Sequence, residues 1–361
     1  MTDAPPAAAP RIEIVDALRG LAALSVAWFH ITDGLEAPSL LKITGAYGWV
    51  GVDIFFVLSG FIIPYSMSRY PGGYALDRLP SFLARRIVRI ELPYLASIAL
   101  ALGALWLAAQ IPGSGWRAPD VWFGLIASHI FYLTPFTDYR WIQVIYWTLA
   151  FEFAFYILIG VFYPAVMRRG SKPLFAAVSV AICALVTALT PLSDAPDHTR
   201  RAVLFVMGLS VCRAHVCADE PRFTYLIIAL AGLTMLSLGG ALEAIVGAAT
   251  SLLLMRLRTN ARALANEGGA LERLGAMSYS LYVTHFVIFS LCFAPLGGIV
   301  GNWPLNALAQ CALTLALCLG CAYGFYVLIE RPAQRLSKRI PSSRLTGFAP
   351  RVPSARRIAA D

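Results

Sequence analysis

Charged residues are scarce in this chain. Asp, Glu, Lys and Arg make up 14% of its 361 residues, whereas 58% are hydrophobic. A soluble domain carries roughly 25% charged residues, so the composition excludes an ordinary soluble protein. Apolar runs near 20 residues long recur from end to end, and each can cross about 30 Å of hydrocarbon as a helix. The runs are continuous rather than alternating, which excludes a membrane β-barrel. The sequence therefore predicts an all-α, polytopic bundle of membrane helices.

Motifs for metal, nucleotide and soluble hydrolase chemistry are missing. The chain contains no HExxH, GxSxG or P-loop pattern. Of its seven cysteines, Cys318 and Cys321 stand three apart, but they lie in an apolar run without His partners. We therefore predict neither a zinc site nor a disulfide framework, and we interpret the cysteines as small core residues. No internal or inverted repeat of the transporter kind is present.

The basic residues indicate how the chain crosses the membrane. The net charge is +9, and Lys and Arg gather in short loops between apolar runs, which is the positive-inside pattern and not a nucleic-acid footprint. The ten predicted spans are about 14–33, 48–67, 86–109, 146–167, 174–191, 201–216, 223–240, 242–257, 276–293 and 305–329.

A further apolar segment, 121–136, is shorter than these spans. If it returns to the side it came from, nearly every basic cluster falls on one face, whereas a full crossing moves the later clusters outside. We therefore predict a re-entrant or interfacial segment, in a multi-pass protein of the cell's inner membrane with both termini cytoplasmic. Residues 1–10 are expected to be a flexible tail rather than part of a cleaved signal peptide. Residues 11–335 are expected to form the membrane domain, and 336–361 a basic tail near anionic lipid.

Ionisable residues inside the first span are candidates for function, because they are expensive in lipid. Arg19 and His30 are eleven residues apart, which returns a helix almost to the same azimuth after a rise of roughly 16 Å. Arg19 is placed towards the cytoplasm and His30 towards the outer half. His can act as a general base and Arg can bind phosphate, although a pair of interfacial anchors explains the same spacing.

Two carboxylates lie in later spans. Asp53 is near the outer end of the second span, where it could pair with His30 or Arg19 or simply face the interface. Glu152 lies about one and a half turns into an apolar run and needs a partner. Trp147, close before it, could stack on a sugar or belong to the aromatic belt.

The remaining candidates follow from helical spacing and from charge. Ser278, Tyr282 and His285 share a helix face, although a buried, hydrogen-bonded His285 is an equally good interpretation. Arg85, Arg86 and Arg89 begin the third span and could grip phosphates or only anchor the helix. The other histidines lack such company, and we interpret them as loop or interface residues: His129, His198 and His215.

Five segments together resemble the membrane-bound acyltransferase 3 family, whose members O-acylate surface polysaccharides, lipooligosaccharides, nodulation factors or macrolides. Arg19 and His30 match its Arg-x10-His motif. The resemblance runs from Arg11 to Arg335, and we expect no fused periplasmic hydrolase-like domain of the kind that some relatives carry. The matching segments are IVDALRG at 14–20, GVDIFFVLSGF at 51–61, Trp147 to Glu152, Ser278 to His285, and Glu330 to Pro332.

The resemblance implies an acyl-CoA donor reached from the cytoplasm and a carbohydrate or glycolipid hydroxyl acceptor near the outer face. Acyl-CoA, with acetyl the expected group, is then a donor substrate and not a bound cofactor. His30 would take the proton of the acceptor, Arg19 would position the donor and Glu152 would hold the acceptor or orient a partner. An acyl-His30 intermediate, a macrolide-like acceptor, an exporter of lipid or solute, and a non-catalytic membrane sensor stay open as alternatives.

Overall fold

The computed structural model describes residues 13–35, 39–112, 116–256, 269–300 and 306–341. Every regular element in these ranges is helical, as the apolar runs predict. The α-helices are α1 Glu13–Asp33, α2 Leu40–Gly45, α3 Gly51–Ser68, α4 Leu79–Arg86, α5 Leu92–Ala109, α6 Phe123–Ile130, α7 Trp147–Val166, α8 Lys172–Leu189, α9 Pro196–Arg200, α10 Val203–Val216, α11 Pro221–Ser237, α12 Ala241–Arg256, α13 Ala270–Ala276, α14 Ser278–Val300, α15 Asn306–Phe325 and α16 Arg331–Arg339. Two π-helical turns, Ile87–Glu91 and Tyr326–Glu330, join α4 to α5 and α15 to α16.

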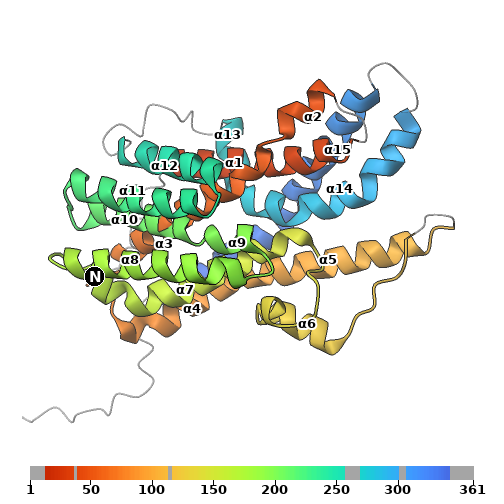
Figure 1. The fold of residues 1–361 in the computed structure, drawn as a ribbon. Helices are drawn as coiled ribbons and strands as arrows, with labels where there is room; N and C mark the ends of the chain where they lie inside the picture. Colours follow the sequence, from red (N-terminus) through yellow and green to blue (C-terminus); the bar gives the residue numbers. More distant parts are fainter. Residues whose placement is uncertain (1–12, 36–38, 113–115, 257–268, 301–305, 342–361) are drawn as a thin grey trace, which may run out of the picture.

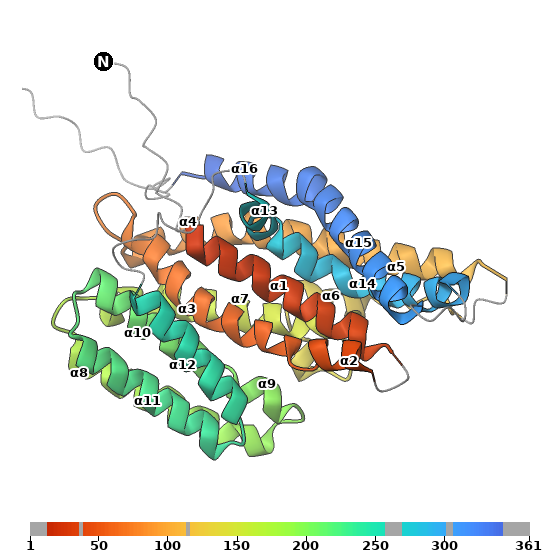
Figure 2. The same ribbon diagram turned by 90° about the horizontal axis from the view of Figure 1, so that it is seen from above.

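Helices α1 and α3 run side by side through the middle of the bundle (Figure 2). On one flank α3 packs against α10, which in turn contacts α8, α11 and α12. On the other flank α1 packs against α13, α14 and α15, and α5 lies against α14. Figure 1 shows the two flanks at opposite ends of the view, with α7 passing beneath α3. The first helix of the chain is therefore a central element, with neighbours from the end of the sequence.

Helices form at all ten places where we predict spans. Six stretches are long and apolar enough to cross a membrane, and a seventh is obtained if α13 and the first part of α14, bent by 76°, count as one span. The protein is thus a multi-pass membrane protein. The other three predicted spans correspond to α10, α11 and α12, which have 14, 17 and 16 residues. The count of ten stays a prediction.

The shortness of α10 has a physical reason. Twelve of its 14 residues are buried, so its sides face protein and not lipid. The chain just before α10 carries Arg201, which pairs with Asp53, and the other end carries Arg213, which pairs with Asp219. The arginines at both ends of α10 are therefore paired inside the protein. At 1.5 Å per residue the helix is about 21 Å long, and this length need not match the thickness of the bilayer.

Segment 121–136 contains two short helices, α6 and a 3₁₀ turn at Thr134–Phe136. The eight residues of α6 span about 12 Å, too little to cross the hydrocarbon core. Buried His129 fixes the turn that follows, because its Nδ1 lies 2.8 Å from the Leu125 carbonyl and its Nε2 accepts the Ile142 N–H. Phe123 and Phe136 are exposed, as expected for a segment at a membrane interface.

Glycines set the closest helix contact. A Cβ on Gly208 would collide with the Val57 carbonyl of α3, and one on Gly60 would collide with the Phe205 carbonyl of α10. The backbones of α3 and α10 therefore touch, as small residues allow in membrane bundles. The sequence predicts this role for the glycines of the 48–61 segment.

The basic helices α4 and α16 lie at the end of the bundle where α1 begins (Figure 2). Helix α16 runs to Arg339, so the first residues of the expected tail are helical. Arg213, counted in the basic face, is fully buried and paired with Asp219, so it is a structural charge. The expected basic loop near 260 lies outside the described residues. Which side of the membrane this end faces stays a prediction.

Candidate functional site

Helix α1 presents Arg19 and His30 to two neighbouring cavities. We call them the arginine cavity, lined by Arg19, and the histidine cavity, lined by His30. The two cavities share Val52 and Tyr282 in their walls. The eleven-residue spacing thus places the two side chains in adjacent cavities along α1.

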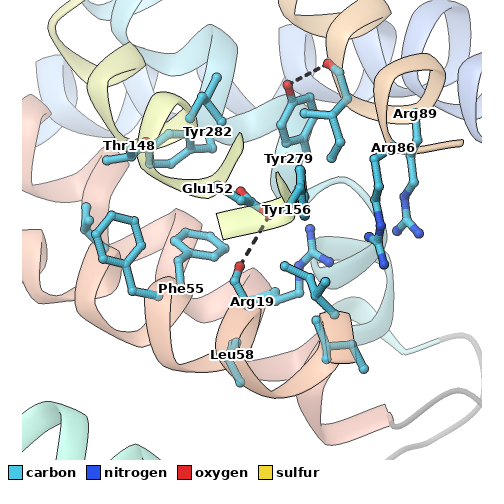
Figure 3. Close-up of a pocket in the computed structure, with 17 residues that line it drawn as sticks. Arg19, Phe55, Leu58, Arg86, Arg89, Thr148, Glu152, Tyr156, Tyr279 and Tyr282 are labelled. Carbon is cyan, nitrogen blue, oxygen red and sulfur yellow. Dashed lines mark hydrogen bonds between the residues drawn. The ribbon is translucent and has the colours of Figure 1, made fainter. Parts of the chain in front are cut away.

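Three arginines converge on the arginine cavity. Arg86, at the end of α4, and Arg89, in the π-helical turn, reach from one segment towards the space that Arg19 enters from α1 (Figure 3). The Nε of Arg19 is buried and has no hydrogen-bond partner among the described residues. Glu152 is the single carboxylate in the lining. The walls therefore carry a net positive charge, which favours an anion.

The π-helical turn is part of this arrangement. π-turns inside α-helices occur frequently at functional sites, and this one, Ile87–Glu91, carries Arg89. Arg86 is held in place because its Nη2 donates to Ser66 Oγ over 2.8 Å and its guanidinium lies 5.3 Å from the ring centre of Tyr156. Both arginines are thus directed into the cavity and not outwards.

Glu152 has the partner that its burial requires. Its Oε1 accepts hydrogen bonds from the hydroxyls of Tyr156, one turn along α7, and of Ser59 on α3, the latter at 3.4 Å. The carboxylate lines the arginine cavity and is not part of the lining of the histidine cavity. Glu152 therefore lies with Arg19 and not with His30.

Aromatic rings form much of the histidine cavity. The imidazole of His198, in α9, stacks on the indole of Trp147 with ring centres 3.7 Å apart and an angle of 5°. Burial, followed by the nearby charge of Arg201, lowers the pKa of His198 from its usual 6.5 to about 4. A neutral imidazole can lie flat against the Trp147 ring without desolvating a charge. Trp49 and Phe29 also line this cavity.

Asp53 has a partner that we did not expect. Its Oδ1 accepts from Arg201 Nε at 2.8 Å, and Arg201 Nη2 lies 3.3 Å from Glu243 Oε1. The expected pairing of Asp53 with His30 or Arg19 is therefore wrong. The reason is that Arg201, just before α10, reaches across to Asp53 on α3 and to Glu243 on α12, where Glu243 also pairs with Arg200. Arg201 also lines the histidine cavity.

Helix α14 contributes Tyr282 and His285. Tyr282 lines both cavities and shares a 2.8 Å hydrogen bond with Thr148 Oγ1. His285 is fully buried, and its ring centre lies 5.4 Å from that of His30. The shared helix face that the spacing predicts therefore does bring these two residues to the site.

Two predicted residues lie elsewhere. Arg85 Nε donates to the Ile340 carbonyl at 2.8 Å, next to α16, and Arg85 does not line either cavity. Ser278 is buried at the first position of α14, also outside both linings. The expected role of Arg85 in gripping the donor is therefore not supported, because its side chain is used to hold α16.

Several lining residues were missed by sequence reasoning: Arg201, His198, Trp49, Tyr156 and Tyr279. For Arg201 a signal was present. Arg200 and Arg201 lie at the end of their span that faces away from the predicted basic face, where other arginines are few. Asp53 and Glu243 lie in apolar runs that start on the same side of the membrane as this pair. A basic pair on the wrong side opposite two intramembrane carboxylates indicates buried ion pairs. His198 carried no such signal.

Comparison with known proteins identifies the family. The profile of the family described as "Acyltransferase domain" matches residues 12–323. The chain is 26% identical over 374 residues to "Acyltransferase MdmB" of Streptomyces mycarofaciens, which covers 91% of this chain and 93% of that protein. No solved structure matches the chain. Among the described residues, no group of three His, Cys, Asp or Glu side chains is placed to hold a metal ion.

Proposed function

Because the chain belongs to the acyltransferase 3 family, we propose that it moves an acyl group from acyl-CoA to a hydroxyl of a carbohydrate or glycoconjugate. One observation carries the proposal. Arg19 and His30, on the same face of α1, open onto two cavities that share Val52 and Tyr282. An anion held at Arg19 and a hydroxyl held at His30 would therefore lie in neighbouring cavities.

The arginine cavity is the proposed donor site. Coenzyme A carries phosphates, and Arg binds phosphate through two parallel hydrogen bonds. Arg19, Arg86 and Arg89 supply three guanidinium groups and Glu152 a single negative charge. From Arg19 to His30 the rise along α1 is roughly 16 Å, a stretch that the extended pantetheine arm can follow. The thioester would then lie beside His30.

The histidine cavity, with a volume of about 200 Å³, is the proposed acceptor site because His30 lines it. Its rings, Trp49, Trp147 and His198, suit the apolar faces of a sugar or another hydroxylated ring. In this orientation the acceptor hydroxyl meets His30, and the aromatic walls of the cavity determine which acceptors bind.

The proposed chemistry is direct transfer. His30 accepts the proton of the acceptor hydroxyl as the oxygen attacks the thioester carbonyl. The new C–O bond forms, the C–S bond breaks, and the departing thiolate of coenzyme A takes the proton from His30. The alternative is attack by His30 itself, which gives an acyl-imidazole that the acceptor then resolves. Rapid quenching of the enzyme with labelled acyl-CoA and no acceptor distinguishes the routes, because only the second labels the protein.

The proposal is tested with purified protein in lipid vesicles, labelled acetyl-CoA and a hydrolysate of surface glycans as acceptors. We expect ester formation matched by release of free coenzyme A. Arg86→Ala and Arg89→Ala should each raise the KM for acetyl-CoA by about tenfold or more, since a hydrogen bond to a charged group is worth that much.

Arg85→Ala is the matched control, because Arg85 belongs to the same basic cluster but bonds the Ile340 carbonyl. Its KM should stay near that of the wild type. Equal KM changes in all three variants would show that general positive charge, and not the cavity, determines donor binding. Coenzyme A release without ester formation on any hydroxyl would contradict the proposed acceptor class.

A further inference from the structure

His285 is buried behind His30 and carries an unused lone pair. Its Nδ1 lies 3.0 Å from the carbonyl oxygen of Leu281, one turn earlier in α14. A carbonyl oxygen can only accept a hydrogen bond, so Nδ1 carries the proton. In the neutral ring the other nitrogen, Nε2, then has a free lone pair. That Nε2 is buried and has no hydrogen-bond partner among the described residues.

The ring that faces His285 across the helix interface is His30. The two ring centres are 5.4 Å apart and the rings are tilted by 30°. His30 is partly exposed to the histidine cavity and His285 is not part of that cavity's lining. The order from the cavity inwards is therefore His30 first and His285 behind it.

Neither Tyr282 nor Cys318 uses the lone pair on His285 Nε2, so it is available to His30. Tyr282 is occupied, because its hydroxyl bonds Thr148 and Ile145. Cys318 contacts His285 through the backbone carbonyl and not through the ring. A buried acceptor without a donor costs free energy, so its retention at this position needs a use.

We propose that His285 is the positioning residue of His30, accepting a hydrogen bond from the His30 ring N–H during acyl transfer. This inference rests on the proposed function. The accepted bond would fix the tautomer of His30 with its own lone pair towards the acceptor hydroxyl. It would also stabilise the imidazolium that forms when His30 takes the proton. A nucleophile, a base and a group that orients the base is the general logic of such sites.

The fixed tautomer of His285 gives the arrangement its direction. Because the Leu281 carbonyl keeps the proton of His285 on Nδ1, Nε2 of His285 can only accept a hydrogen bond. His30 is then the donor in a hydrogen bond between the two rings. His30 must then direct its N–H inwards and its lone pair into the cavity. The Leu281 carbonyl, which fixes the tautomer of His285, thus also determines which ring nitrogen of His30 faces the acceptor.

The test compares His285→Leu with His285→Gln in the vesicle assay. Leucine fills the volume but removes the acceptor, and misalignment of the base is expected to lower kcat by about 100-fold. The side-chain oxygen of glutamine can reach the place of Nε2, so His285→Gln should exceed His285→Leu in kcat by about tenfold. The KM for acetyl-CoA should be unchanged in both, because the arginine cavity is untouched.

Ser290→Ala is the control on the same helix, since Ser290 also bonds a carbonyl one turn earlier, that of Phe286. Its kcat should match the wild type. Wild-type kcat in His285→Leu, or equal losses in His285→Leu and His285→Gln, would overturn the inference.

His30→Ala separates this inference from the proposed function. If His30→Ala is inactive while His285→Leu is fully active, only the positioning role fails. If His30→Ala itself keeps wild-type turnover, the proposed mechanism fails as well.

Discussion

Arg201 determines which charges line the histidine cavity. Its guanidinium meets Asp53 at 2.8 Å and Glu243 at 3.3 Å, and it lies 5.1 Å from the ring centre of Trp49. Taking isolated charges out of water costs several kcal/mol each, and only well-made pairs offset this. The single guanidinium in the histidine cavity is therefore committed to carboxylates, which leaves hydroxyl and ring contacts for an acceptor.

The buried pair can be tested by a double-mutant cycle. Arg201→Met should lower stability by about 3–5 kcal/mol, because it leaves the buried Asp53 carboxylate without its partner. Asp53→Asn should cost less, because Arg201 keeps its contacts with Glu243 and the Asp197 carbonyl. The double variant should lose much less than the sum of the two. Thermal unfolding of the detergent-solubilised protein measures all four forms. Strictly additive losses would mean that the two side chains do not interact.

Sequence reasoning at the residue scale succeeds within a helix and fails between helices. Arg19 and His30 were placed on one face because their spacing is a property of a single helix. The partners of Asp53, Trp147 and His30 come from other segments, and periodicity along one segment does not encode them. The pairs Asp53–Arg201, Trp147–His198 and His30–His285 follow from packing and needed the structure.

At the scale of elements, the contact between α3 and α10 joins one flank of the bundle to its middle. Its closeness depends on Gly60 and Gly208, whose missing Cβ atoms leave room for facing backbone carbonyls. In lipid, van der Waals packing of this kind drives much of the association between helices. The helix that carries Asp53 is positioned through this contact against the segment that carries Arg201.

Gly208→Ala is therefore expected to be destabilising. The added methyl group meets the Val57 carbonyl, which belongs to the backbone and cannot turn aside, and overpacking of this kind costs about 1–3 kcal/mol. Gly232→Ala in α11 is the control, because a Cβ there meets only Met207 Cε at 3.9 Å. Thermal unfolding should separate the two variants. Equal stability would contradict the close contact of α3 and α10.

The extent of each element was predictable only where lipid sets it. Runs that face the bilayer need about 20 apolar residues, and the six long apolar stretches obey this. Helix α10 does not, because its neighbours α3, α11 and α12 replace lipid around it. A hydropathy pattern cannot distinguish a helix surrounded by protein from one that faces lipid, so the sequence supports the existence of these helices but not their length.

For the whole molecule, the distribution of charge predicts one cytoplasmic face. Helices α4 and α16, both basic, lie at the same end as the start of α1 (Figure 2). This prediction depends on segment 121–136, because a full crossing there would place all later basic clusters on the outer side of the membrane. Its helices are short, because α6 has eight residues and the 3₁₀ turn Thr134–Phe136 has three.

Cysteine labelling of intact cells measures this topology. We expect a membrane-impermeant thiol reagent added from outside to label Asp138→Cys, in the loop after α6, and to miss Gly170→Cys, between α7 and α8. After permeabilisation both positions should react, which shows that Gly170→Cys is accessible. Labelling of Gly170→Cys in intact cells would place the basic face outside and reverse the proposed direction of transfer.

The division of labour between the two cavities is the central claim, and His30→Asn tests it most directly. Asparagine keeps a polar side chain but cannot accept the proton, and loss of a general base typically costs about 10²–10⁴ in rate. The same purified sample should be used for equilibrium binding of acyl-CoA and for ester formation in vesicles. The account predicts binding within about twofold of the wild type, a difference well under 1 kcal/mol, and ester formation close to background. Ester formation near the wild-type rate, or loss of acyl-CoA binding together with turnover, would contradict it.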